Sequence, residues 1–229
     1  MIRMFEPRQE ILPLVQRLLW PRLAPAAGIG FVLYGGTAIA LRLGHRNSVD
    51  FDFFSEIPLD RGRIAGAMPF LSGATVLQDE ENALGVLVAS AAPDQVQVKV
   101  SFFGSIGFGR VGVPEATADR VLLVASLDDL MATKLKVVLQ RAEAKDYRDI
   151  AAMIVAGVDL SRGLSAARAI FGPNFQPAES LKALNYFADG DLRTLTKQEK
   201  DILVNAAGAV GALPEVAIVS RRLANSDAA

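Results

Sequence analysis

The chain has 229 residues, a formal net charge of −1 and no cysteine. This length supports a sizeable hydrophobic core in one domain or two small ones. The absence of cysteine excludes disulfides, zinc–thiolate sites and cysteine nucleophiles, and the near-neutral charge argues against a global basic surface for nucleic acid. Charges near the N-terminus do not fit a signal peptide, and no uncharged apolar run reaches the roughly 18 residues of a membrane span. We therefore expect a cytoplasmic protein with no membrane partner.

The N-terminal segment predicts one short helix. Apolar residues recur at helical spacing between Arg8 and Leu19, but Pro13 interrupts the pattern and favours a helix start after it. Pro21 ends or kinks the pattern. Trp20 lies at that end and is expected to pack on the core rather than to stack on a ligand.

The stretch over residues 31–55 combines a strand, a tight turn and a helix. Residues 31–34 are apolar or aromatic and predict a buried strand. Gly35 and Gly36 permit a sharp turn and a close approach of the backbone to a ligand. Thr37 can cap a helix over residues 38–43, and its hydroxyl could equally meet a phosphate.

Two carboxylates follow in the next predicted strand. Asp50 and Asp52 alternate with Phe51 and Phe53, which places both carboxylates on one face and both rings on the other. The pair could simply be solvated, but Asp is depleted in strands. Two carboxylates on one face favour a divalent cation shared with substrate phosphates, and backbone N–H groups of the Gly-Gly turn could bind the same phosphates.

Further elements complete the first half. Asp60 is expected to cap a helix over residues 60–67, and strands over 74–77 and 85–89 are expected to flank an acidic turn. Strict alternation over residues 95–103 predicts a half-buried strand. Its polar face carries Gln97, Lys99 and Ser101, and short strands are expected over residues 111–113 and 121–124.

The second half reads as helical. Ser126 and Asp129 form a predicted capping box, a helix is expected over residues 145–155, and Thr196 with Glu199 forms a second box. A last helix is expected over residues 215–223. The organisation predicted is an α+β half with a mixed sheet over residues 1–125, followed by a helical half over residues 126–229.

Two segments carry a family resemblance. Tyr34-Gly35-Gly36, a spacer of thirteen residues, and Asp50-Phe51-Asp52-Phe53 resemble the signature of the polymerase-β-like nucleotidyltransferase superfamily. The fuller string GGTAIALRLGHRNSVDFDFF resembles one branch more closely, the AbiEii/AbiGii toxin-type nucleotidyltransferases. Residues 134–149 resemble the second characteristic region of that branch.

The resemblance implies the polymerase-β-like core and a metal-dependent transfer of a nucleotide from an NTP to an acceptor. Mg²⁺ or Mn²⁺ would be the cofactor, the acceptor would be RNA such as a tRNA 3′ end, and a cognate antitoxin protein would be a partner. The implied catalytic residues are Asp50 and Asp52, which would also hold the metal, with Lys134 and Asp146. The implied nucleotide-binding residues are Gly35, Gly36, Thr37, Arg46 and Ser48.

One feature departs from the resemblance. The superfamily often carries a third carboxylate on the strand predicted over residues 95–103, and here the polar face of that strand has none. Asp146 is the candidate for the missing acid if the helical half brings it, with Lys134, to the aspartate pair. These residues also have structural alternatives to a role in the site. Arg46 could form a surface salt bridge, and Lys134 and Asp146 could be ordinary helix-surface charges. The rival functions are a small-molecule nucleotidyltransferase of the aminoglycoside type and a non-catalytic binding protein of the same fold.

Overall fold

The computed structural model describes residues 3–89 and 97–224 of the chain. The chain divides into two compact units, and segments from both sides of residue 125 contribute to each. We call them the sheet unit (Met1–Phe108, Val113–Ala125 and Arg221–Ala229) and the helical unit (Gly109–Gly112 and Ser126–Ser220). Residues Gln95 and Val96, which begin one predicted strand, lie outside the described residues.

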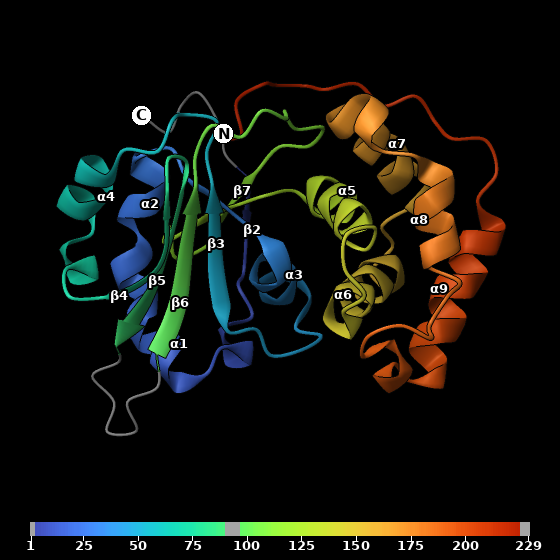
Figure 1. Cartoon of the computed structure of the whole chain (residues 1–229), viewed down its shortest axis with the longest axis horizontal. Helices are drawn as coiled ribbons and strands as arrows, with labels where there is room; N and C mark the ends of the chain where they lie inside the picture. The colour runs from blue at the N-terminus through green and yellow to red at the C-terminus, as the bar shows by residue number, and fades with distance from the viewer. Residues whose placement is uncertain (1–2, 90–96, 225–229) are drawn as a thin grey trace. The chain divides into compact units, whose positions relative to one another are not determined.

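The sheet unit is built on a mixed sheet with the strand order β1-β7-β8-β2-β3-β6-β5-β4 (Figure 1). Its central strand β3 is antiparallel to β2 and parallel to β6, so the predicted mixed sheet is confirmed. The strands are β1 (Met4–Phe5), β2 (Val32–Tyr34), β3 (Asp50–Phe54), β4 (Thr75–Glu80), β5 (Ala83–Ala89), β6 (Gln97–Phe103), β7 (Glu115–Thr117) and β8 (Leu123–Val124).

Helices α1, α2 and α4 group on one side of this sheet, and α3 follows β2 directly (Figure 1). Pro13 precedes α1 and Asp60 caps α4 by accepting a hydrogen bond from the backbone of Arg63, as the sequence predicts. The helices are α1 (Leu14–Leu19), α2 (Pro25–Gly28), α3 (Gly35–Leu43) and α4 (Arg61–Ala67), with 3₁₀ turns η1 (Gln9–Ile11), η2 (Trp20–Leu23) and η3 (Pro69–Leu71).

Aromatic rings fill the core on the helix-covered face of the sheet. Phe51 and Phe53 of β3 are essentially inaccessible, and the Phe53 ring stacks on that of Phe102 in β6 with centroids 5.4 Å apart. Trp20 is buried and lies 6.4 Å from the Phe51 ring, so its packing role is confirmed. Each buried aromatic side chain contributes on the order of 2 kcal/mol through removal from water. This layer holds β3 in register and thereby fixes the opposite face, which carries the aspartates.

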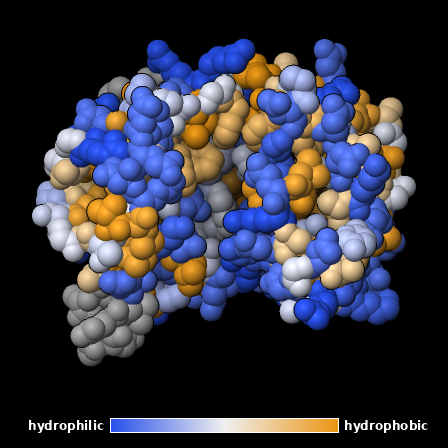
Figure 2. Space-filling model, viewed as in Figure 1, coloured by the Kyte–Doolittle hydropathy of each residue, from blue (hydrophilic) through white to orange (hydrophobic). Residues whose placement is uncertain are grey.

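The outer edge of the sheet at β4 is partly apolar. Val76 and Leu77 are more than half exposed, and Figure 2 shows hydrophobic residues gathered over the strands at this edge. Acidic residues at the end of β4 and the ion pair of Arg61 with Asp79 place charges beside them. Charges on an edge strand oppose edge-to-edge pairing with another chain.

The helical unit contains α5 (Leu127–Val137), α6 (Ala144–Val155), α7 (Leu160–Phe171), α8 (Pro177–Ala183) and α9 (Lys197–Ala209), with 3₁₀ turns η4 (Gly172–Asn174) and η5 (Leu192–Thr194). Helix α7 packs closely on α5, because a Cβ at Gly163 would lie 2.4 Å from Met131 Cγ. The helix predicted over residues 145–155 is confirmed, and it corresponds to α6.

The two predicted helix caps differ in form. Thr196 and Glu199 form a reciprocal capping box at the start of α9, as predicted. Ser126 caps α5 by accepting from the backbone N–H of Asp129, and the Ser126 hydroxyl in turn donates to Asp129 Oδ2 at 2.6 Å. The Asp129 carboxylate also accepts from the backbone N–H groups of Val111 and Gly112, at 2.7 and 3.2 Å, which joins the segment Gly109–Gly112 to the helical unit.

Two predicted elements are wrong. Residues 111–113 form no strand, and the two short strands of that region are β7 and β8. The helix predicted over residues 215–223 is absent from the described residues. Arg110 forms an isolated β-bridge with Ser220, so the backbone groups there pair with a distant segment rather than within a helix. None of the helices within residues 3–89 and 97–224 combines the length and hydrophobicity that a membrane span requires.

Candidate active site

Strand β3 presents its two aspartates on one face. Asp50 and Asp52 are partly exposed, whereas Phe51 and Phe53 between and after them are buried on the other face. The strand pairing places Asp50 beside Lys99 and Asp52 beside Ser101 in β6. The predicted alternation of β3 is therefore confirmed. In β6, Gln97 and Lys99 are exposed as predicted, whereas Ser101 is buried.

Gly35 brings the α3 N-terminus against Asp52. Tyr34, the residue before it, is the strand partner of Asp52. Gly35 has a φ of +75°, and a Cβ there would lie 2.8 Å from Asp52 Oδ2. Only glycine gives this backbone conformation without strain and leaves room for the carboxylate. The side chain of the N-cap residue, Tyr34, makes no cap hydrogen bond to the start of α3.

The hydroxyls of Thr37 and Ser48 bind each other rather than the helix end. Their Oγ atoms are 2.7 Å apart, both residues are buried, and Thr37 Oγ1 also donates to the backbone carbonyl of Asp50. The prediction that Thr37 caps the helix was wrong, because the N-cap is Tyr34 and Thr37 lies inside α3. The observed contacts join α3 to the loop before β3 and fix the position of Asp50, where β3 begins.

Two cationic side chains belong to the same region. Arg46 lies in the loop between α3 and β3, and its Nη1 donates to the carbonyl oxygen of Asn47 at 2.9 Å. Lys99 is exposed and is the β6 neighbour of Asp50. Its strand position on the polar face is the signal that identifies it as a cation next to the aspartate pair.

The third carboxylate is absent from β6, as the sequence indicates. Ser101 occupies the position beside Asp52, and it is buried. Within the described parts of the chain, no three His, Asp or Glu side chains lie together as a metal-binding group. The aspartate pair therefore provides two carboxylates that could hold a cation.

The helical unit contains a buried ion cluster of its own. Lys134 Nζ on α5 lies 2.6 Å from Asp146 Oδ1 and 2.7 Å from Asp149 Oδ2 on α6. Arg141 Nε donates to the other oxygen of Asp146 at 2.8 Å. The two carboxylates are inaccessible, and Lys134 is 5% exposed. These residues are therefore a buried network, which excludes the alternative of ordinary surface charges.

The electrostatics of this cluster keep Asp146 ionised. Burial alone would raise the pKa of the Asp146 carboxyl, but hydrogen bonds and charge from Arg141 and Lys134 hold that pKa below its ordinary value. Both Asp146 oxygens already accept hydrogen bonds. A carboxylate in this state is a weak proton acceptor, so the contacts favour a role in holding Lys134 over the predicted role of general base.

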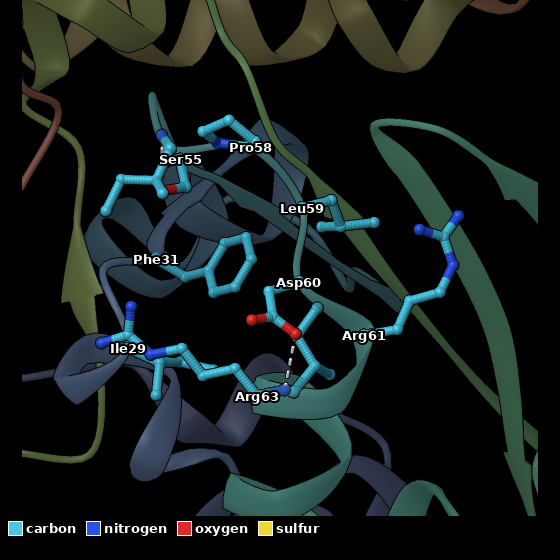
Figure 3. A pocket seen from close by; sticks show the side chains of 10 residues that line it. Ile29, Phe31, Ser55, Pro58, Leu59, Asp60, Arg61 and Arg63 are labelled. Carbon is cyan, nitrogen blue, oxygen red and sulfur yellow. Dashed lines mark hydrogen bonds between the residues drawn. The ribbon is translucent and has the colours of Figure 1, made fainter.

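A pocket of about 530 Å³ lies elsewhere on the sheet unit (Figure 3). Phe31 and Ser55 line it with residues of the loop before α4, and Asp60 and Arg63 lie at its α4 side. The Phe31 ring packs on Phe53 and Phe102, which belong to the core face of the sheet. The pocket is thus separated from Asp50 and Asp52 by the sheet itself, and we do not assign it to the candidate active site.

Comparison with known families agrees with this geometry. Residues 17–203 match the model of the AbiEii family, described as a nucleotidyl transferase AbiEii toxin of a type IV toxin–antitoxin system. The chain belongs to the AbiEii nucleotidyltransferase family. The match includes the Gly-Gly turn and both aspartates of the sheet unit, as well as Lys134 and Asp146 of the helical unit. The recognition made from the two sequence segments is confirmed.

A curated relative and solved structures extend the comparison. The uncharacterized protein aq_aa25 of Aquifex aeolicus is 33% identical over 122 residues, which span 52% of this chain and about half, 55%, of that protein. A putative nucleotidyltransferase from H. pylori has a TM-score of 0.56 at 19% identity, covering 84% of this chain and 91% of its own. The nucleotidyltransferase toxin MenT4 of Mycobacterium tuberculosis has a TM-score of 0.54 at 14% identity, covering 85% and 83%. These likenesses confirm the α+β nucleotidyltransferase fold.

Proposed function

We propose that this AbiEii-family chain transfers a nucleotide from an NTP to an acceptor in a reaction that requires a divalent metal ion. The observation that carries the proposal is the contact of the Asp52 carboxylate with Gly35 at the N-terminus of α3, with Asp50 on the same face. A helix N-terminus attracts phosphate, and a carboxylate pair attracts a divalent cation. The two features therefore suit the triphosphate and its metal together.

The residues present fit Mg²⁺ or Mn²⁺. Mg²⁺ is bound in most nucleotide sites by one or two carboxylates, with waters and substrate phosphates completing its shell. Asp50 and Asp52 would hold it, since both are partly exposed on one face of β3. When bound, the metal would offset the negative charge that develops on the phosphates.

Side chains and backbone groups of the chain would bind the phosphates and position the site. Gly35 and Gly36 would bind phosphate oxygens through their backbone N–H groups, and Lys99 and Arg46 would add positive charge. Thr37 and Ser48 would act indirectly by holding the start of β3, as their contacts with each other and with Asp50 support. In the transfer, an acceptor oxygen bonds to the α-phosphorus, the bond to pyrophosphate breaks, and the acceptor hydroxyl releases its proton.

Lys134 and Asp146 are proposed as further contributors to the reaction. The ammonium group of Lys134 would supply charge for the phosphates, and Asp146 would position it, acting through Lys134 rather than on the substrate. A change in KM or in the pH profile of an Asp146 variant would separate this role from a purely structural one, provided that a variant destabilised equally at another position shows no such change. The two residues and the aspartate pair belong to different units, so their joint action remains a prediction.

The acceptor is proposed to be RNA, such as a tRNA 3′ end, in the cytoplasm, with an antitoxin protein as cognate partner. Support comes from the family description, which names a toxin of a type IV toxin–antitoxin system, and from the toxin MenT4, which shares the fold. A second candidate, a non-catalytic binding protein, is favoured by one observation. Ser101 occupies the place beside Asp52 where a third acid would be expected.

An acceptor screen tests the proposal. The purified chain would be incubated with each NTP and Mg²⁺ or Mn²⁺, together with total RNA, aminoglycosides or protein, and the products analysed by mass spectrometry. We expect RNA to gain the mass of a nucleotide with release of pyrophosphate. Transfer to an aminoglycoside alone would assign the small-molecule alternative. No transfer to any acceptor with either metal would overturn the proposal and support the non-catalytic candidate.

A further inference from the structure

The aspartate face of the sheet continues into a group of aromatic rings. Phe54 is the next residue of β3 on the face of Asp50 and Asp52, and its strand partner on β6 is Phe103. We call Tyr34, Phe54, Phe103 and Phe108 the aromatic cluster. All four belong to the sheet unit.

The cluster is held in one arrangement by its own contacts. The Phe54 ring stacks on that of Tyr34 with centroids 4.9 Å apart and planes 12° apart. It meets the Phe103 ring edge-on at 5.2 Å and lies 6.3 Å from that of Phe108. Phe54 is thus the centre of the cluster, and a ligand would meet rings that are already in place, which reduces the entropic cost of binding.

Tyr34 is buried, but the other three rings of the cluster differ from the aromatic rings on the core face. Phe51, Phe53 and Phe102 are buried beneath helices, which accounts for them as packing. Phe54, Phe103 and Phe108 remain partly exposed, although each is large and apolar. Partly exposed aromatic side chains are the usual platforms on which nucleobases stack.

The spacing relates the cluster to the reacting groups. Phe54 lies two positions after Asp52 along β3, which corresponds to about 7 Å. This is the scale on which a nucleotide separates its base from its phosphate or its ribose hydroxyl. Resting on the proposed nucleotidyl transfer, we propose that the aromatic cluster binds the nucleobase of a nucleotide whose reacting end lies at Asp50 and Asp52.

The stacked base could belong to the NTP or to the terminal nucleotide of the acceptor. Both present the same π-face, and both react at the aspartate pair. Stacking on carbon rings recognises a flat base without hydrogen-bond readout, so the cluster is predicted to bind purines more tightly than pyrimidines and to tolerate both. Selection of one NTP would then depend on other residues.

Binding measurements with base-free ligands test this inference directly. Calorimetry would compare ATP with ribose 5-triphosphate, and an RNA oligonucleotide with the same oligonucleotide lacking its 3′-terminal base. The variants are Phe54→Leu and, to restore an aromatic ring, Phe54→Tyr. Phe70→Leu is the matched control, because Phe70 is a partly exposed phenylalanine of the same unit that packs under Arg22 outside the cluster.

We expect Phe54→Leu to weaken the ligand that carries the stacked base roughly five- to a hundredfold. The base-free counterpart should bind wild type and Phe54→Leu equally, and Phe54→Tyr should restore affinity. An effect on ATP alone assigns the cluster to the NTP, and an effect on the oligonucleotide alone assigns it to the acceptor. Equal losses for base-bearing and base-free ligands, or no loss for either, would overturn the inference.

The outcomes also separate this inference from the proposed function. Base-dependent binding without any nucleotide transfer would overturn the transfer reaction and leave the base site standing. Nucleotide transfer without a base-dependent loss of affinity in Phe54→Leu would overturn the base site and leave the transfer reaction standing. If the wild-type protein bound none of the four ligands, both would be overturned. Should Phe54→Leu fail to fold by circular dichroism, Phe103→Leu provides the same comparison from the neighbouring strand.

Discussion

At residue 35 the backbone and a carboxylate approach more closely than a side chain would permit. Gly35 has a left-handed φ, and its missing Cβ leaves the space that Asp52 Oδ2 occupies. The Gly-Gly turn is therefore more than a turn. Its first residue sets the distance between the α3 N-terminus and one of the two candidate metal ligands.

We expect Gly35→Ala to lose nucleotide transfer out of proportion to its loss of stability. The left-handed backbone costs about 1 kcal/mol for alanine, and the new methyl group would displace the Asp52 carboxylate. Gly44→Ala is the matched control, since Gly44 has a φ of +67° but its Cβ would meet only the Arg8 side chain, at 3.6 Å. Denaturant unfolding and transfer rates would be measured for both. Equal loss of activity in the two variants would contradict the role given to Gly35.

At the scale of elements, helices α5 and α6 are joined by charge as well as by apolar packing. Lys134 on α5 binds Asp146 and Asp149 on α6, and all three are buried. Removing one partner of such a group leaves a buried charge uncompensated, which costs about 3–5 kcal/mol. The cluster therefore couples the stability of the helical unit to pH.

The direction of that coupling follows from Asp146. Its folded-state pKa is lowered, whereas its unfolded pKa is about 3.9. The carboxylate thus stabilises the fold above about pH 4, and this contribution is lost as the pH falls through the folded-state pKa. We expect the unfolding free energy to drop steeply in acid, and Asp146→Asn to be less stable at pH 7 but less sensitive to acid. Asp201→Asn, an exposed partner of Lys197, should match wild type at every pH.

The same elements show which features of the fold and of the site could be predicted from the sequence. Alternation in β3 and β6 is a short-range pattern, so the face of Asp50 and Asp52 and the neighbouring polar face were predictable. The Gly-Gly turn, the caps at Ser126 and Thr196 and the missing acid at Ser101 were equally local. Contacts between distant segments could not be predicted in this way. The Asp129 carboxylate binds residues 111 and 112, where a strand was predicted, and Ser220 pairs with Arg110 in a region where a helix was predicted.

The contacts of individual site side chains were unpredictable for the same reason. Thr37 and Ser48 both have residue types that suit phosphate, but their mutual contact depends on how the loop returns to β3. Asp146 has the residue type of a general base, yet its partners Lys134 and Arg141 alter its chemistry. Residue type and spacing located the region of the site, and tertiary contacts determined which atoms remain available.

At the scale of the whole molecule, the proposed activity depends on nucleotide binding at the aspartate pair. Membership of the AbiEii family and the nucleotidyltransferase fold are consistent with an NTP as substrate. The near-neutral charge of the chain, −1 overall, implies that phosphate is bound by a local arrangement rather than by a general basic field. The local arrangement that we identify is Asp50, Asp52 and the N-terminus of α3.

The most direct test is calorimetry of NTP binding with and without Mg²⁺, comparing wild type with the Asp50→Asn, Asp52→Asn double variant. We expect the Mg²⁺-dependent affinity to disappear in the double variant, while its stability changes little because two like charges are removed from a partly exposed face. Asp79→Asn, which alters a carboxylate on the β4 edge of the same unit, should bind as wild type does. Unchanged Mg²⁺-dependent affinity in a folded double variant would contradict the central claim.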